Sequence, residues 1–149
     1  MQFDPDMLTY LRAIARRDRE TADRAEVRLD EAGWDNFPRV LMMVFCLTLR
    51  LRLGTAPNYA QIMQFVAELR SAAPGDPADI DAAAAGSLIA ATFGQDIGPE
   101  EVEADMAIQI QVSTLTHVLG APEVTEEEVD EVFQLSALAL EMAPQVRPT

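Results

Sequence analysis

The sequence has no lysine, a single cysteine and a single histidine, few aromatic residues and no long apolar stretch. The lone cysteine, Cys46, cannot form a disulfide within the chain, so the fold does not depend on an oxidising compartment. The longest apolar run, Val40–Leu47, is far shorter than the roughly 18–20 residues of a membrane span. No basic segment followed by an apolar stretch marks a secretory signal at the N-terminus. We therefore expect a cytoplasmic protein.

The missing lysines make all eleven basic residues arginine, and these are unevenly distributed. Residues 1–75 hold ten arginines and ten acidic residues, whereas residues 76–149 hold one arginine, Arg147, and fifteen acidic residues. The net charge of −14 therefore comes entirely from the second half (1 − 15 = −14). Nucleic acid is not expected to bind this half, because phosphate binding needs cations.

The length of 149 residues is typical of one domain. Glycine and proline stand where helix ends place them. Five glycines follow apolar-periodic segments, where a left-handed residue ends a helix: Gly33, Gly54, Gly75, Gly94 and Gly120. Prolines that open helices follow a capping residue at Asp4-Pro5, Asp76-Pro77 and Gly98-Pro99. Thr125 and Glu128 have the spacing of a capping box.

These signals predict an all-α fold, a single bundle of five to six helices formed by residues 1–143, with a flexible C-terminal tail over residues 144–149. The helix over residues 37–53 is apolar on most sides, as is typical of the buried centre of a bundle. The predicted helices are Pro5 to Ala32, Phe37 to Leu53, Tyr59 to Ala73, Pro77 to Phe93, Pro99 to Leu119 and Glu126 to Met142.

Two segments, Leu47–Leu53 and Ile108–Val112, alternate apolar and polar residues with period two, as a half-buried strand does. A small sheet within an α+β domain is therefore an alternative. The segments between stop signals are longer than ordinary strands of five or six residues. We expect helix at both places.

Reactive side chains are few. His117 could act as a general base or metal ligand, but its position near a predicted helix C-terminus also suits a histidine that complements the helix dipole. Cys46 lies among apolar residues, which favours a core cysteine over an activated nucleophile. No Gly-x-Ser-x-Gly motif and no phosphate-binding loop occurs. We assign no catalytic, cofactor-binding or metal-ligating residue and expect no cofactor.

One carboxylate pattern is suggestive. Glu100-x-x-Glu103 is followed, after 23 residues, by Glu127-x-x-Asp130. This pattern resembles the paired Glu-x-x-Glu and Glu-x-x-Asp of the all-α nucleoside triphosphate pyrophosphatases. The resemblance implies a magnesium-dependent nucleotide hydrolase, whose four carboxylates hold the hard cation through oxygen atoms. Both pairs also lie in the first turns of predicted helices, where acidic residues complement the helix dipole.

The segment Arg12–Arg28 is rich in arginine and provides a second alternative, a transcriptional regulator that binds DNA through its N-terminal helix. Acidic residues are interleaved with these arginines, as on a solvated, salt-bridged face. Arg50 and Arg52 are expected to act as internal partners of the acidic half.

The last predicted helix has two apolar faces. Val129, Phe133, Ala137 and Leu140 can fill the core. Leu135, Leu138 and Met142 lie roughly opposite and have no evident place in a monomer, so we predict that they bind a partner. The resulting expectation is a protein–protein interaction module, namely an adaptor, a regulator or a homo-oligomeric scaffold. Its partner would be another protein or a second copy in a homodimer, without nucleic acid or membrane.

Overall fold

The computed structural model describes residues 4–72, 76, 79–95 and 102–142, and this part of the chain contains seven α-helices and no strand. The all-α prediction is confirmed. Leu47–Leu53 lies within a helix, as does Ile108–Val112, so neither alternating segment is a strand. The helices are α1 Pro5–Ala15, α2 Arg19–Ala32, α3 Phe37–Leu53, α4 Tyr59–Ala72, α5 Ala82–Thr92, α6 Ala104–Leu119 and α7 Glu126–Met142.

The first predicted helix, Pro5 to Ala32, is wrong as one element, because the chain turns between α1 and α2. Arg17 has a φ of 61°, in the left-handed region that residues other than glycine rarely adopt. The Asp18 carboxylate then accepts hydrogen bonds from the Thr21 backbone N–H, at 3.2 Å, and the Thr21 hydroxyl, at 2.7 Å. Asp18 thus starts a new helix by capping it, which a continuous helix would not allow.

The predicted ends of α3 and α7 agree with the structure, and α4 runs to Ala72, while its predicted last residue, Ala73, lies outside the described residues. The expected starts at Pro77 and Pro99 and the expected tail lie outside the described residues. Within them, α5 begins at Ala82, where the Asp81 carboxylate caps the Ala84 N–H at 3.1 Å. The capping box at the start of α7 is confirmed, with the Glu128 N–H donating to the Thr125 hydroxyl at 3.1 Å.

Not every glycine acts as a left-handed stop. Gly33, Gly54 and Gly94 have positive φ, as predicted, whereas Gly120 has a φ of −87°. Gly75 lies outside the described residues. Gly120 is needed for a different reason: a Cβ there would lie 2.7 Å from the carbonyl oxygen of Ala15. Because glycine has no side chain, the end of α6 can approach the end of α1 at this position.

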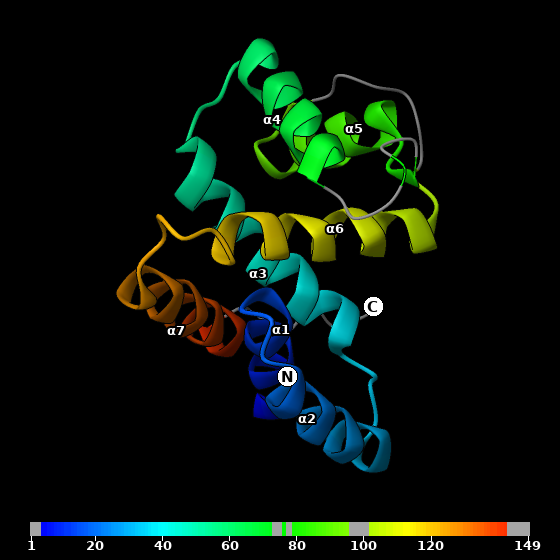
Figure 1. The fold of residues 1–149 in the computed structure, drawn as a ribbon, viewed down its shortest axis with the longest axis vertical. Helices are drawn as coiled ribbons and strands as arrows, with labels where there is room; N and C mark the ends of the chain where they lie inside the picture. The colour runs from blue at the N-terminus through cyan, green and yellow to red at the C-terminus, as the bar shows by residue number, and fades with distance from the viewer. Residues whose placement is uncertain (1–3, 73–75, 77–78, 96–101, 143–149) are drawn as a thin grey trace.

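The helices do not confirm a single bundle. α6 crosses the middle of the molecule, with α4 and α5 on one side and α1, α3 and α7 on the other, while α2 packs on α1 (Figure 1). The core runs across this arrangement through fully buried side chains such as Leu11, Phe45, Phe65, Ile89 and Leu115. No helix in the described ranges is long and apolar enough to cross a membrane.

α3 is central but is not buried on every side. It packs against α1, α6 and α7, and its buried residues Val40, Leu41, Val44, Phe45, Thr48 and Leu49 form one stripe. On its outer side, Met42 and Leu51 are each 37% exposed. The other helices therefore do not cover all the apolar side chains of α3.

Candidate functional site

α7 presents the three predicted partner-binding residues to solvent. Leu135 is 44% exposed, Leu138 51% and Met142 72%. Their spacing of three and four residues places them on one side of the helix, which we call the outer face of α7. The opposite side is packed into the core through Val129, Val132, Phe133, Ser136 and Leu140. Whether a partner covers the outer face stays a prediction.

Acidic residues accompany the outer face. Glu127, Glu131 and Glu141 are exposed and make no ion pair or side-chain hydrogen bond with another described residue. At about 100° per residue, these glutamates and the outer face fall within about a third of the helix circumference. α7 contains no basic residue. Solvent therefore meets an apolar stripe with unpaired carboxylates beside it.

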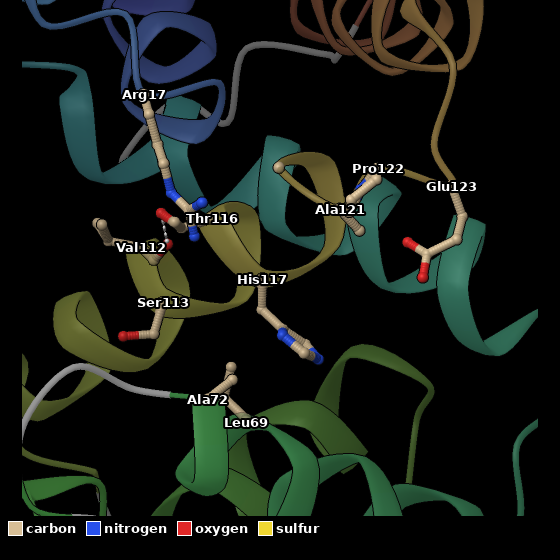
Figure 2. A pocket seen from close by; sticks show the side chains of 11 residues that line it. Arg17, Leu69, Ala72, Val112, Ser113, Thr116, His117, Ala121, Pro122 and Glu123 are labelled. Carbon is tan, nitrogen blue, oxygen red and sulfur yellow. Dashed lines mark hydrogen bonds between the residues drawn. The ribbon is translucent and has the colours of Figure 1, made fainter.

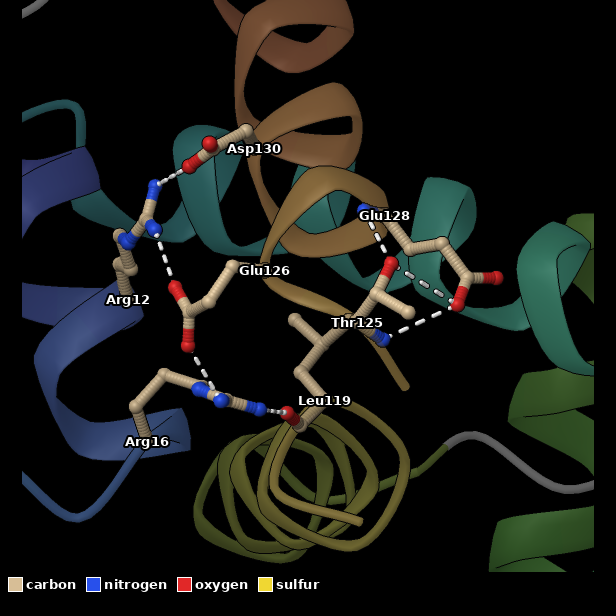
Figure 3. Close-up of polar contacts among 7 residues, drawn as sticks. All are labelled: Arg12, Arg16, Leu119, Thr125, Glu126, Glu128 and Asp130. Atoms are coloured by element: carbon tan, nitrogen blue, oxygen red, sulfur yellow. Dashed lines mark hydrogen bonds and ion pairs between the residues drawn. The ribbon is translucent and has the colours of Figure 1, made fainter. Parts of the chain in front are cut away.

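The acids on the adjacent side of α7 are engaged within the molecule (Figure 3). Arg12 of α1 forms ion pairs with Asp130 and with Glu126, the latter at 2.9 Å. Arg16 also pairs with Glu126 and donates to the carbonyl oxygen of Leu119, at 2.7 Å, at the end of α6. Two arginines thus fix the first turn of α7 against α1 and α6.

The structure does not bring the carboxylate pattern together. Glu103 precedes α6 and Glu127 follows it, and α6 has 16 residues, so its ends are about 24 Å apart at 1.5 Å per residue. Asp130 is paired with Arg12, and Glu100 lies outside the described residues. In the described ranges no group of three or more His, Cys, Asp or Glu side chains could hold a metal ion. The spacing in the sequence had suggested that the two carboxylate pairs lie close together, but α6 separates Glu103 from Glu127.

Four of the six arginines in the arginine-rich segment form ion pairs, and the other two, Arg17 and Arg19, are exposed. Arg12 and Arg16 are paired with α7, Arg24 pairs with Glu20 at 3.0 Å and Arg28 with Asp6 at 2.9 Å. The predicted internal partners of the acidic half were Arg50 and Arg52. Arg52 instead pairs with Glu68 of α4, which belongs to residues 1–75 and not to the acidic second half. The arginines that pair with Glu126 and Asp130 of α7 are Arg12, in α1, and Arg16, directly after it.

A hollow of about 760 Å³ lies beside the last turns of α6 (Figure 2). Its walls come from the end of α4, the α1–α2 turn and the α6–α7 loop, and include Leu69, Arg17 and Glu123. His117 extends from α6 toward Leu69 and Ala72 of α4 (Figure 2). Because three distant segments form the hollow, no local sequence pattern indicated it.

His117 is held by contacts between helices. Its Nε2 lies 3.7 Å from an oxygen of Glu68, and its ring centroid is 5.9 Å from that of Phe65. Arg52 shares Glu68 and lies over the Phe65 ring at 5.6 Å. No hydrogen bond joins His117 to a hydroxyl or thiol of the described residues, so no nucleophile and base are paired here.

Cys46 has the properties of a packed thiol. It is half-buried on α3, and burial raises its pKa, with Arg50 lowering it to a smaller extent. An activated nucleophile requires a depressed pKa. Its thiol is therefore protonated at neutral pH.

Comparison with protein-family models, with curated proteins and with solved structures finds no match. Functional assignment therefore rests on the surface and the contacts described above.

Proposed function

We propose that this protein is a protein–protein interaction module, an adaptor, regulator or oligomeric scaffold, that binds its partner through the outer face of α7. The observation that carries the proposal is the exposure of Leu135, Leu138 and Met142 on one side of a helix whose other side is packed. Contiguous exposed apolar surface on a small protein typically marks a contact. The proposed compartment is the cytoplasm, because the single cysteine can form no disulfide within the chain.

The contacts that hold α7 in the fold support this role. Its first turn is fixed by Arg12 and Arg16 and by the capping box, and its inner side is anchored by buried side chains such as Phe133 and Leu140. A helix held in this way presents its outer face without further ordering. Binding to a preorganised surface loses less conformational entropy than binding to a mobile one.

Site-specific photo-crosslinking in the native cell tests the proposal. A photoreactive phenylalanine analogue replaces Met142 in the full chain, and a matched chain carries it in place of Val27 on α2, which is also apolar and is 59% exposed. We expect discrete adducts from position 142 and none of the same mass from position 27. The adducts from position 142 should disappear when Leu135→Gln and Leu138→Gln are added.

Adducts of the same pattern from both positions would show general stickiness and contradict the proposal. Absence of adducts at position 142 would contradict it equally. An adduct with twice the mass of the chain would identify a second copy as the partner, and any other mass would identify a different protein.

A further inference from the structure

We infer that the outer face of α7 binds an amphipathic helix of another protein, one whose apolar stripe is flanked by arginine or lysine. This inference rests on the proposed interaction function and specifies the chemistry of the partner. It comes from two properties of this surface, namely exposed apolar side chains and nearby carboxylates that have no ion-pair partner among the described residues.

The position of the carboxylates favours a basic partner. Glu131 stands one helical turn before Leu135 in line with the apolar stripe, and Glu141 stands three residues after Leu138 at the edge of the stripe, so a helix docked on the stripe would have one carboxylate beneath it and one beside it. Neither has an ion-pair partner among the described residues. Arginine or lysine beside the partner's apolar stripe would reach them, as flanking charges do across paired helices.

A second copy of the chain fits this surface poorly. If two outer faces pair antiparallel with Leu135 opposite Leu138, Glu131 of one copy comes close to Glu141 of the other. A parallel pairing places each glutamate opposite its equivalent. Each copy also carries a net charge of −14. Like charges brought together in an interface oppose association, so the surface selects against itself.

Anionic surfaces are unsuitable for the same reason. Membranes with anionic lipids attract basic segments and repel acidic ones, and nucleic acid binding needs cations that α7 does not contain. A helix fits the geometry because three apolar side chains with a spacing of three and four residues match the apolar stripe of another helix. Arginine or lysine flanks add attraction that neutral flanks would not.

Two synthetic helical peptides test the inference against the full chain. They share the same leucine stripe, and one carries arginine at the flanking positions whereas the other carries glutamate. We expect the basic peptide to bind at least about tenfold more tightly than the acidic one at low salt. This preference should shrink between about 50 mM and about 500 mM salt, because salt screens exposed charges.

Variants locate the binding. The Leu135→Gln/Leu138→Gln chain should lose about tenfold or more in affinity for the basic peptide, since it removes the apolar contact. The Glu131→Gln/Glu141→Gln chain should lose affinity and much of the salt dependence. Glu26→Gln/Glu31→Gln removes the same charge from exposed positions of α2, so this control should bind as the wild type does.

Three results would overturn the inference. One is equal binding of the two peptides, or binding of neither. Another is equal loss of affinity in the α7 and α2 glutamate variants, which would show attraction to the acidic protein as a whole. The third is a wild-type homodimer that the leucine variant dissociates, which would overturn the basic partner but uphold the interaction function. Absence of photo-crosslinked adducts at position 142 would instead contradict the interaction function itself, whatever the two peptides do.

Discussion

Two sets of acidic residues on α7 are used in opposite ways. Glu126 and Asp130, in the first turns of the helix, pair with Arg12 and Arg16, whereas Glu131 and Glu141 are exposed and have no ion-pair partner among the described residues. The first set joins elements that are more than a hundred residues apart in the chain. The difference teaches that acidic composition alone does not identify a surface; whether an arginine lies within reach decides the role of each carboxylate.

The largest expected effect separates the inner side of α7 from its outer face. Leu140 is buried and Leu138 is half exposed; they are two residues apart on the same helix and therefore on opposite sides of it. Leu140→Ala should lower the free energy of unfolding by about 2–5 kcal/mol through lost burial and a cavity. Leu138→Ala should change it by no more than about 0.5 kcal/mol. Denaturant unfolding measures both free energies. Equal losses of stability in the two variants would contradict the assignment of Leu140 to the core and Leu138 to the outer face.

The second-largest effect on stability is expected at Gly120, where the end of α6 approaches α1. In Gly120→Ala the added methyl would clash with the Thr116 carbonyl oxygen and lie 2.7 Å from the Ala15 carbonyl oxygen, so both the end of α6 and its approach to α1 must shift. We expect a loss of about 1–3 kcal/mol, the usual cost of overpacking. Gly54→Ser is a useful contrast, because Gly54 has open space around it and only the strain of a positive φ. Gly120→Ala that unfolds at the wild-type midpoint would show that this approach is not needed.

The ion pairs at the first turn should contribute less. Arg16→Gln removes an ion pair with Glu126 and a hydrogen bond to the Leu119 carbonyl, and should cost about 0.5–1 kcal/mol at low salt. Arg24→Gln removes an exposed ion pair within α2 and a long hydrogen bond to the Thr21 hydroxyl, at 3.5 Å, and should cost about 0.3–0.5 kcal/mol. Unfolding at low and high salt measures both. Identical losses in the two variants would mean that Arg16 does not fix α7.

The smallest effect concerns acid pH at the α1–α2 turn. Hydrogen bonds from Thr21 lower the pKa of Asp18 below 3.8, with Arg24 adding a smaller effect. Because the folded pKa is below the unfolded one, this stabilisation is present above the unfolded pKa and is lost as pH falls through the folded pKa. Carboxyl NMR should show the lowered pKa, and Thr21→Ala should raise it toward its ordinary value. An unchanged pKa in Thr21→Ala would show that the Thr21 hydroxyl does not stabilise the Asp18 carboxylate.

Periodicity and capping predicted much of the helical structure. The bounds of α7 and the exposure of Leu135, Leu138 and Met142 follow from spacing, because a helix with two apolar sides can pack only one of them against a small core. The break at Arg17 was missed, although Asp18 and Thr21 carry its signal, because the charge pairs across that segment also suit a continuous helix.

Contacts between helices could not be predicted from the sequence in the same way. The spacing of Glu103 and Glu127 says nothing of the straight helix that separates them. The pairing of Arg12 with Asp130 joins opposite ends of the chain, and no local pattern encodes it. The role of Gly120 depends on how closely another helix approaches, which a single sequence does not reveal.

The most direct measurement is amide NMR of the isotopically labelled full chain during titration with the basic helical peptide. We expect the changes in chemical shift to concentrate on α7 from Glu131 to Met142 and to leave α2 unaffected. Concentration on that stretch would place the partner on the outer face. Changes spread over acidic residues throughout the protein, or none in α7, would contradict a docking surface there.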